Sequence, residues 1–553
     1  MSPNAPARNP APVGSGAPMW HGAVIFGISF AFLFVTMGLG VNVYDEGLIV
    51  FGAMRVMNGD VPYRDFYANY GPAQFYVLAG LFKLFGPSIL INRIWDTFVR
   101  AATVMLIYAI FARMESSRMG MIAAAASALW LAAFGYYGYP IYPCLLMTVL
   151  SVYFVLPEYC REAGRTPLLL AGGCIGVTAL FRHDVGALAA ISHIAALTLF
   201  QVKARLEGVE RSPKLIPAVA LFAVGVLLVA VPVWSLVMVI ASPTEVLRDL
   251  VIIPMETYGR MRSLPFKWNS VNNWGVFLPP VVGLTGIVIA LNFRGGRASM
   301  GAKVATATMQ CMRGGALLLV ACCSLFFTLK GVLRISLRHL ALALVPSLLT
   351  ACLAWLLAPG SRHGRVLALL LAVPMALVSI GAAIVDYTTL MTNKEWMLNS
   401  VDAGDKCHSA AGLERLGCFK ADQDQLAAIR FVQERTADDE RIFVGLESHD
   451  RIFVNDVLFY FLSKRLSATK WHHFDPGVQT TPEIQTEMVG ELEAIKPKIV
   501  VLRSDWSDIR EPNESSISSG VSILNDFIRA HYVPAATFAG IQVYELRREA
   551  PPG

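Results

Sequence analysis

The sequence predicts a polytopic α-helical membrane protein of about eleven transmembrane helices, followed by a C-terminal soluble α/β domain. Three observations predict this class. Of the 553 residues, 55% are hydrophobic and only 16% are charged, whereas an ordinary soluble domain has about 25% charged residues. The mean hydropathy is +0.53. After about residue 390 the long apolar runs stop and charged residues become frequent.

Apolar runs long enough to cross about 30 Å of hydrocarbon recur along the first part of the chain. They lie at 22–42, 92–112, 119–137, 141–157, 167–182, 185–202, 215–241, 273–293, 308–329, 335–357 and 365–388. The first run lacks the small-residue cleavage site of a signal peptide, so it is read as a retained span. We therefore expect a disordered N-terminus at 1–21, a membrane domain at 22–390 and a soluble domain at 391–553.

Lys and Arg gather in alternate short loops, and this pattern predicts the orientation. The positions are Arg113 and Arg118, Arg161 and Arg165, Lys203 to Lys214, Arg294 to Lys303, and Arg362 and Arg365. Loops rich in Lys and Arg stay in the cytoplasm. The N-terminus joins them, and an odd number of spans then puts the C-terminal domain and the long first loop, 43–91, on the outer side.

Charge and cysteine content exclude other classes. The formal charge of +6 is small, and no dense basic tract is present, which argues against nucleic-acid binding. None of the nine cysteines has metal-site spacing. Cys407 and Cys418 lie in a polar region, and in an oxidising compartment we expect them to pair.

The C-terminal region has the pattern of a small α/β domain. Short buried strands are predicted at 440–446, 496–504 and 540–546, and helices at 481–496, with a Thr cap, and at 521–532. No phosphate-binding loop, dinucleotide fingerprint or nucleophile elbow occurs in it. Its polar residues His449, Asp450, Asn455 and Asp456 are read as solvated loop residues.

Asp45 and Glu46 follow the first span directly, where charge is costly. One interpretation is a helix cap, because the sequence from residue 45 has a helical pattern with acids at its start. The other is a catalytic site, since one acid suffices for a cap. Further along this loop, Tyr63 and Arg64 are candidate substrate contacts, although Arg64 can instead pair with Asp65, and 72–86 predicts a helix lying in the interface.

Asp184 sits at an outer turn between two apolar runs, flanked by Arg182 and His183. Two interpretations are open. The acid and Arg182 form a local ion pair, or Asp184 is a second acid facing the same cavity as Asp45, with Arg182 and His183 contacting the substrate.

Residues 242–269 form an outer segment in which basic side chains alternate with apolar ones. Such segments commonly hold lipid headgroups. The functional interpretation is a phosphate site, because Arg offers a fork of donors to phosphate oxygens. The candidates are Arg248, Tyr258, Arg260 and Arg262, with Arg338 from a later loop on the same side.

Carboxylates beside an arginine-rich membrane edge suit a substrate that has a lipid tail, a phosphate and a group to transfer. The tail partitions into the bilayer, Arg binds the phosphate, and a carboxylate takes the proton from an attacking hydroxyl. This chemistry needs no redox cofactor. ATP is absent on the outer side, which favours an already activated lipid donor.

The stretch "YDEG…NGDVPYRDFYANYGPAQFYVLAGLFKLFG" resembles the GT-C class of glycosyltransferases that use polyprenyl-phosphate sugars. The likeness is to the bacterial branch that includes protein O-mannosyltransferases and lipid A aminoarabinose transferases. It covers about residues 20–390, most strongly the first hundred. The resemblance implies a GT-C-like fold in a bacterial inner membrane and a multi-pass transferase for cell-envelope glycans.

Carried onto this chain, the resemblance assigns Asp45 as catalytic base, Glu46 as its acidic neighbour and Asp184 as a second acid. It implies that Arg248, Arg260, Arg262 or Arg338 holds the lipid phosphate. It also implies inversion at the anomeric carbon, membrane lipids around the site, and a glycan, lipid or protein acceptor. Members of this branch often work without a bound metal; no cofactor is expected, and a divalent metal stays open.

Two other functions are compatible with the composition. A transporter or flippase of lipid-linked saccharides would place ionisable residues within the spans and show internal repeats. No repeat is evident, and the acids cluster at the outer boundary, which favours the enzyme. A scaffold for envelope assembly would tolerate substitution at Asp45.

Overall fold

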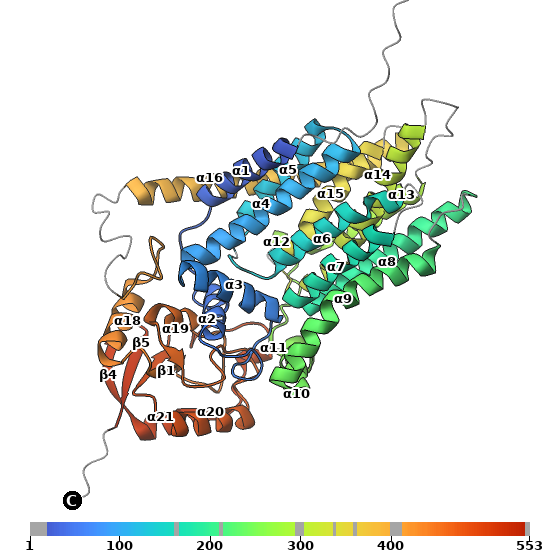
Figure 1. Cartoon of the computed structure of the whole chain (residues 1–553). Coiled ribbons are helices and arrows are strands. Elements are labelled where there is room, and N and C mark those ends of the chain that lie inside the picture. Colours follow the sequence, from blue (N-terminus) through green and yellow to red (C-terminus); the bar gives the residue numbers. More distant parts are fainter. Residues whose placement is uncertain are drawn as a thin grey trace, which may run out of the picture.

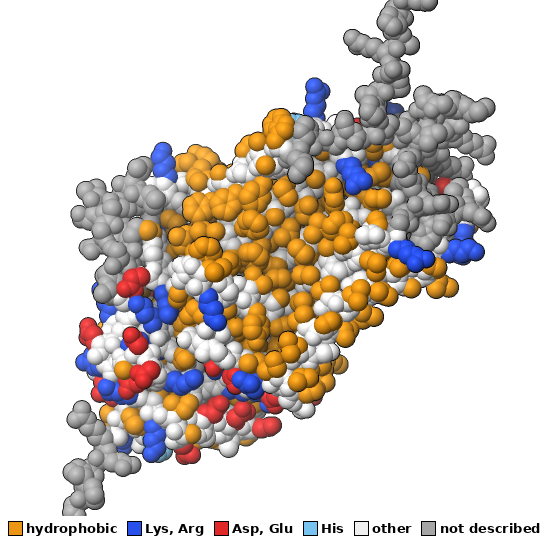
Figure 2. Space-filling view, viewed as in Figure 1, with side chains coloured by type: hydrophobic (Ala, Val, Ile, Leu, Met, Phe, Trp, Pro, Cys, Tyr) orange, Lys and Arg blue, Asp and Glu red, His pale blue; other side chains and the backbone are white. Residues whose placement is uncertain are grey.

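The computed structural model describes residues 19–135, 137–159, 165–208, 214–292, 304–335, 339–357, 362–398 and 412–547. A bundle of apolar helices makes up the larger part, and a mixed sheet with its helices forms the C-terminal part (Figure 1). Figure 2 shows a broad hydrophobic band over the bundle, with charged side chains gathered at its two ends. This is the surface of a protein whose middle lies in hydrocarbon.

Every predicted span coincides with a helix. The helices are α1 (Met19–Val35), α4 (Ile89–Met114), α5 (Ser117–Ala133), α6 (Ile141–Val155), α7 (Arg165–Phe181), α8 (His183–Leu206), α9 (Leu215–Ala241), α13 (Leu278–Asn292), α14 (Val304–Phe327), α15 (Ala341–Leu357) and α16 (Arg362–Leu398). Within the described residues, 6 segments are long and apolar enough to cross a membrane by length and composition. The number of eleven crossings stays a prediction.

The ends of the helices differ from prediction where local chemistry intervenes. The helix α1 stops at Val35, not 42, and the chain runs extended to Asp45. The helix α4 starts where Ser88 Oγ accepts a hydrogen bond from the Ile91 amide at 3.2 Å, an N-cap. The helix α15 starts only at Ala341, because a short 3₁₀ turn, η5 (Thr328–Gly331), and a loop precede it.

Two helices of the loop 43–91 lie between the bundle and the C-terminal part (Figure 1). They are α2 (Asp45–Met57) and α3 (Pro72–Phe85), the second being the predicted interface helix. Residues 242–261 form α10 (Pro243–Leu247), the π-helical turns η2 (Arg248–Ile252) and η3 (Pro254–Tyr258), and α11 (Gly259–Met261). Short turns elsewhere are η1 (Leu156–Tyr159), α12 (Val271–Trp274) and η4 (Gly275–Phe277).

The C-terminal part is a five-stranded sheet in the order β2-β1-β3-β5-β4. Its elements are α18 (Gln423–Arg435), β1 (Arg441–Leu446), α19 (Val457–Ser463), β2 (Leu466–Ser467), α20 (Pro482–Ile495), β3 (Ile499–Arg503), η7 (Glu514–Ser516), α21 (Ile523–His531), β4 (Tyr532–Phe538) and β5 (Ile541–Leu546). The strand β1 pairs in parallel with β2 and β3, and β5 runs antiparallel to β3 and β4. All five predicted elements of this region are confirmed, including the Thr481 cap of α20.

The C-terminal part packs directly on the first outer loop. The helix α19 lies on α2 at Gly47, where an added Cβ would sit 2.5 Å from the Leu458 backbone nitrogen. The Leu458 amide donates to the Val43 carbonyl at 2.9 Å, and the amide of Lys420 donates to the Leu39 carbonyl at 2.8 Å. Apolar residues of both parts share one core. The two parts therefore hold each other in a fixed position around Asp45.

Three predictions from polar residues in the C-terminal region have different outcomes. His449, Asn455 and Asp456 are fully buried rather than solvated, because each is hydrogen-bonded inside the fold. Cys418 is disulfide-bonded, but its predicted partner, Cys407, lies outside the described residues. Of the residues 1–21 predicted to be disordered, the first 18 also lie outside the described residues, whereas 19–21 already belong to the helix α1, so the prediction is wrong for these three.

Acidification is expected to destabilise the C-terminal part. His449 and His473 are buried, and burial lowers the pKa of each to about 4, whereas an unfolded His has a pKa of about 6.5. Between these values the unfolded chain binds protons that the folded chain does not. As the pH is lowered from about 6.5 to about 4, the free energy of unfolding should therefore decrease. Each His contributes up to about 1.4 kcal/mol per pH unit to this decrease.

Thermal unfolding in detergent between pH 7.5 and 5 measures this dependence. His473→Phe should flatten it, since the ring stacks on Tyr67 at 4.6 Å between centroids and a Phe preserves that contact. His531→Gln is the control, because His531 is exposed at the end of α21. Equal pH dependence in all three proteins would contradict the assignment.

Candidate functional site

One cavity of about 180 Å³ is lined by residues of the loops at one end of the bundle, at 44–48, 69–70, 139–141, 182, 258–262, 330–334 and 339. It combines one carboxylate with four cations. The polar groups that line it are Asp45, Arg182, Arg262, Lys330, Arg334, Asn69, His339, Tyr44, Tyr70, Tyr139 and Tyr258. Asp45, Arg182, Tyr258 and Arg262 are sequence-predicted site residues, and the fold brings these four together from three separate outer segments.

Asp45 begins α2 and is partly exposed to the cavity. Its carboxylate accepts a hydrogen bond from Asn42 Nδ2 at 3.2 Å, and its amide donates to Asn42 Oδ1 at 2.8 Å. Burial raises the pKa of Asp45, while Arg262, Asn42 and Arg334 act against that rise. The carboxyl group is therefore a stronger base than a free aspartate, and no cation of the described residues forms an ion pair with it.

Glu46 points away from this cavity and is almost fully buried. Its two oxygens accept from Arg93 Nε and Nη2, each at 2.8 Å. Arg93 also donates to the carbonyls of Gly38 at 2.5 Å and Gly40 at 2.7 Å. The pair ties the segment between α1 and α2 to α4, and in this way it fixes where Asp45 lies.

Replacing Glu46 by Gln is expected to destabilise the protein. The buried guanidinium of Arg93 loses its counter-charge, a change that costs about 3–5 kcal/mol. The apparent Tm in detergent should fall, and Glu46→Leu combined with Arg93→Met should recover part of it. Loss of activity at a wild-type Tm would instead indicate a direct catalytic role for Glu46.

Asp184 lies in the first turn of α8, and two cationic side chains bind its carboxylate. It accepts from Arg182 Nε at 3.0 Å and Nη2 at 2.9 Å, and from Lys330 Nζ at 2.5 Å. Asp184 does not itself line the cavity, whereas Arg182 and Lys330 do. The local ion pair weighed for Arg182 and Asp184 is present. His183 is half-buried beside it and does not line the cavity.

The predicted phosphate-binding residues of the segment 242–262 lie in different places, and only some of them line the cavity. Arg248 pairs with Glu245 at 2.9 Å and lies outside the cavity lining. Arg260 is 65% exposed, 3.5 Å from Glu514. Tyr258 and Arg262 line the cavity, with the guanidinium carbon of Arg262 4.9 Å from the ring centre of Tyr258. Arg338 lies outside the described residues.

Arg262 and Arg334 differ in how much of each guanidinium is free. Arg334 is held by Glu511 through Nη1 at 2.9 Å and Nη2 at 2.6 Å. Arg262 uses only Nη1, which donates to Asp475 at 2.8 Å. Among the described residues no partner engages its Nε or Nη2. Arg262 is thus the cation best able to bind an anion that enters the cavity.

Tyr63 and Arg64 do not reach the cavity. Tyr63 is fully buried, with a φ of 71°, and its hydroxyl donates to the Tyr70 carbonyl at 2.7 Å. It therefore supports Tyr70, which lines the cavity. Arg64 is 49% exposed and pairs with Asp65 at 2.8 Å, the structural alternative considered from the sequence.

Close backbone contacts position Tyr70 and Arg182. A Cβ on Gly71 would lie 2.1 Å from the Leu180 carbonyl oxygen, and the Gly71 amide donates to the Phe181 carbonyl at 3.0 Å. This approach presses the first outer loop against the turn between α7 and α8. The guanidinium carbon of Arg182 lies 5.2 Å from the ring centre of Tyr70.

The loop between α5 and α6 brings Tyr139 to the cavity, and sequence reasoning missed it. Gly138 has a φ of 71°, and a Cβ there would lie 2.2 Å from Asn92 Oδ1. Its amide donates to Asp96 at 3.0 Å, and its carbonyl accepts from Gln74 at 2.8 Å. The aromatic and Gly-rich sequence "FGYYGYP" is the signal that could have found it.

Asp475, from the loop before α20, is a second residue that sequence reasoning missed. It is fully buried directly behind the cavity wall. Burial alone would raise the pKa of its carboxyl, but Arg262, His473 and the hydroxyls of Tyr44 and Tyr67 together lower it. Asp475 is therefore ionised, and no local sequence signal distinguishes it.

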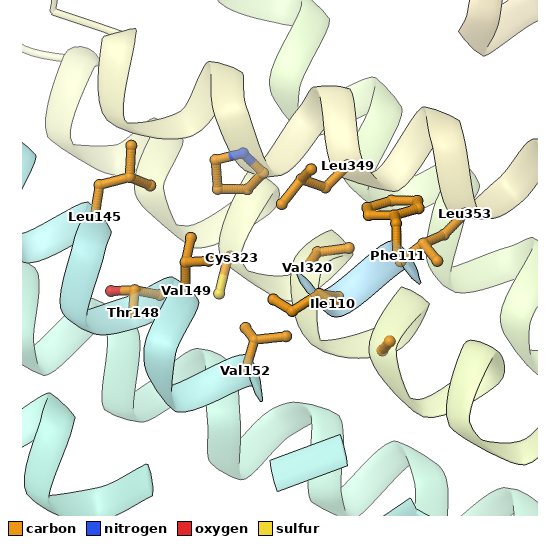
Figure 3. A pocket seen from close by; sticks show the side chains of 12 residues that line it. Ile110, Phe111, Leu145, Thr148, Val149, Val152, Val320, Cys323, Leu349 and Leu353 are labelled. Carbon is orange, nitrogen blue, oxygen red and sulfur yellow. The ribbon is translucent and has the colours of Figure 1, made fainter. Parts of the chain in front are cut away.

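Other candidate sites carry less chemistry. Figure 3 shows the side chains that line a second cavity between α4, α6, α14 and α15, which are apolar apart from Thr148 and Cys323. The volume of this cavity is about 20 Å³. No charged group lines it, so it is a packing gap. Among the described residues no group of three His, Cys, Asp or Glu side chains could hold a metal ion.

Comparison with known proteins identifies the fold. No family model and no curated protein sequence matches the chain. Two crystal structures of ArnT from Cupriavidus metallidurans, one bound to undecaprenyl phosphate and one in the apo state, align over 96% of this chain and 98% of theirs, with 15% identity and a TM-score of 0.53. The oligosaccharyltransferase AglB from Archaeoglobus fulgidus, in complex with an inhibitory peptide and a dolichol-phosphate, aligns over 96% of this chain and 74% of its own at 11% identity, with a TM-score of 0.48. The alignment with ArnT over nearly the whole length confirms the expected GT-C-like membrane fold with a C-terminal sheet.

Proposed function

We propose that this GT-C-like chain is a membrane glycosyltransferase that moves a sugar from a polyprenyl-phosphate donor to an acceptor hydroxyl. The reaction takes place on the extracytoplasmic face of a bacterial inner membrane, with the N-terminus in the cytoplasm. One observation carries the proposal. A single cavity is lined both by Arg262, whose guanidinium is only partly engaged, and by Asp45, whose carboxylate forms no ion pair among the described residues.

The cations of the cavity bind the donor phosphate. Arg262 offers two unengaged donor nitrogens, and charge-assisted hydrogen bonds from Arg to phosphate are about twice as strong as neutral ones. Arg182 and Lys330 add positive charge at the cavity wall. The phosphate is anionic in the bound donor and in the departing polyprenyl phosphate, so the positive charge of the cavity stabilises both. It also stabilises the negative charge that develops on the leaving oxygen during the reaction.

The lipid tail leaves the cavity along apolar surface. Leu333 lines the cavity and is 49% exposed, and Leu329 and Val332 beside it are 58% and 51% exposed. Exposed aliphatic side chains next to a charged pocket suit a ligand with an apolar chain and a polar head.

Asp45 is the general base of the transfer. The acceptor oxygen attacks the anomeric carbon as the bond from that carbon to the phosphate oxygen breaks. The hydroxyl proton passes to the Asp45 carboxylate, and the polyprenyl phosphate leaves with the bonding electron pair. Attack opposite the leaving group inverts the anomeric configuration. The raised pKa of Asp45 improves its match to a proton acceptor near neutral pH. The acceptor is a glycan, lipid or protein, and no cofactor enters the reaction as written.

Lipids that copurify with the protein test the donor class. Mass spectrometry of the purified protein should detect a polyprenyl phosphate or its sugar derivative, and incubation with an acceptor-containing membrane extract should convert the second to the first. A polyprenyl-phosphate sugar that is bound but never consumed would support a flippase instead. Absence of any polyprenyl phosphate would overturn the donor assignment.

A further inference from the structure

We propose that Asp475 of the C-terminal part is a positioning residue for the phosphate site, acting through Arg262. The inference rests on the proposed function, because it concerns the same lipid phosphate. It assigns a role to the C-terminal part: the carboxylate that holds Arg262 at the cavity wall comes from outside the membrane domain.

Several hydrogen-bond donors surround the Asp475 carboxylate. Five donors from two segments, the loop 43–91 and the segment 242–269, meet at this one buried carboxylate. They are Arg262 Nη1 at 2.8 Å, the hydroxyls of Tyr44 and Tyr67 at 3.0 Å each and of Tyr258 at 3.1 Å, and Asn69 Nδ2 at 3.4 Å. Four of these residues line the cavity, whereas Tyr67 does not. The shape of the cavity wall therefore depends on where Asp475 lies.

Hydrogen bonds and a close packing contact fix the loop that carries Asp475. The Asp475 amide donates to Gln479 Oε1 at 2.9 Å, and the preceding Phe474 amide donates to Asn455 Oδ1 at 2.9 Å. Gly477, with a φ of 82°, leaves room for Met261, whose Cγ would lie 2.6 Å from an added Cβ. The loop that carries Asp475 is thus fixed both inside its own part and against the segment that carries Arg262.

Asp475 holds the guanidinium of Arg262 through one nitrogen. It binds only Nη1, so the guanidinium is anchored at one corner while Nε and Nη2 have no partner among the described residues. A long Arg side chain that is not anchored loses rotational freedom when it binds a ligand, and that loss weakens binding. A side chain anchored by a fixed carboxylate has already lost it. Asp475 therefore pre-organises the donor fork for the phosphate.

A double-mutant cycle tests this role, with undecaprenyl phosphate as the probe and the full chain in detergent. Asp475→Asn should raise the Kd for the lipid at least tenfold in the wild-type background. In an Arg262→Ala background the same change should alter the Kd less than twofold, because the group through which it acts is already gone. A purely structural role would give the same loss in both backgrounds and would overturn the proposal.

A second variant guards against misfolding of Asp475→Asn. Tyr67→Phe removes one hydrogen bond to Asp475 at a position outside the cavity lining. It should raise the Kd about threefold with Arg262 present and leave it unchanged without it. Glu514→Gln, an exposed interface acid that contacts Arg260, is the matched control and should leave the Kd unchanged.

The outcomes separate the two proposals. If the wild-type protein fails to bind undecaprenyl phosphate, the proposed function falls and this inference falls with it. If the wild type binds, Arg262→Ala weakens binding, and both Asp475→Asn and Tyr67→Phe leave it unchanged, the donor class stands and the positioning role is overturned.

Discussion

Replacing Asp45 by Asn is expected to lower kcat/KM for sugar transfer by about 10²–10⁴-fold, the usual contribution of a general base. Asn is nearly isosteric with Asp but cannot accept the hydroxyl proton. The apparent Tm should stay near the wild-type value, because within the described residues the Asp45 carboxylate accepts one hydrogen bond, from Asn42 at 3.2 Å. Initial rates of transfer from a polyprenyl-phosphate sugar, together with thermal unfolding, measure both effects.

Asp65→Asn is the matched control for this prediction. Asp65 lies on the same outer loop and pairs with Arg64 at the surface, outside the cavity lining. Its loss should change the rate less than twofold. Unchanged transfer by the Asp45 variant, or an equal loss in both variants, would remove Asp45 from the mechanism.

The pH profile offers a second readout of the same group. Because burial raises the pKa of Asp45, kcat/KM should fall on acidification with a midpoint above about 3.9, the value for a free aspartate. The base must be ionised to act, so activity is present above that midpoint and lost below it. The acid limb should be missing from the residual activity of Asp45→Asn.

Replacing Arg262 by Ala is expected to weaken binding of undecaprenyl phosphate about 10–100-fold. A hydrogen bond to a charged group contributes about 1.5–3 kcal/mol, and about 1.4 kcal/mol corresponds to tenfold in Kd. Titration of the lipid into the detergent-solubilised protein measures the change. The apparent Tm must be recorded in parallel, since the variant leaves Asp475 buried without its cationic partner.

Arg260→Ala is the control for Arg262→Ala. The two arginines lie two positions apart, yet Arg260 is 65% exposed and reaches Glu514 rather than the cavity. Its loss should leave the Kd within about twofold of wild type. If Arg260→Ala weakens binding as much as Arg262→Ala, a diffuse surface charge holds the lipid and the specific role of Arg262 is wrong.

Asp45 and Glu46 are adjacent in the sequence but have different surroundings in the structure. The residue pattern offered both Asp45 and Glu46, and only the family resemblance assigned the base to Asp45. On α2 successive side chains point about 100° apart. One therefore faces the cavity and the other faces α4, where Arg93 binds it. The choice between them depends on which helix lies on which side, and no local pattern encodes that.

Asp184 illustrates the same limit in another form. The alternatives were a local ion pair with Arg182 and an acid open to the cavity. Lys330, which follows Asp184 by 146 positions, adds a second cation to that carboxylate. A carboxylate held by two cations is a poor proton acceptor at neutral pH, because both partners favour its ionised form.

The sequence by itself determined what depends on neighbours along the chain. Runs of apolar residues predicted the helices of the bundle, short buried runs predicted β1, β3 and β5, and helical patterns, with a Thr cap for α20, predicted α20 and α21, because hydrophobic burial and backbone capping act over a few residues. Only the tertiary structure decided which polar side chains meet. Asp475 reaches Arg262 across 213 positions, and such a contact arises from how the C-terminal part packs on α2, through shape and burial that no single segment carries.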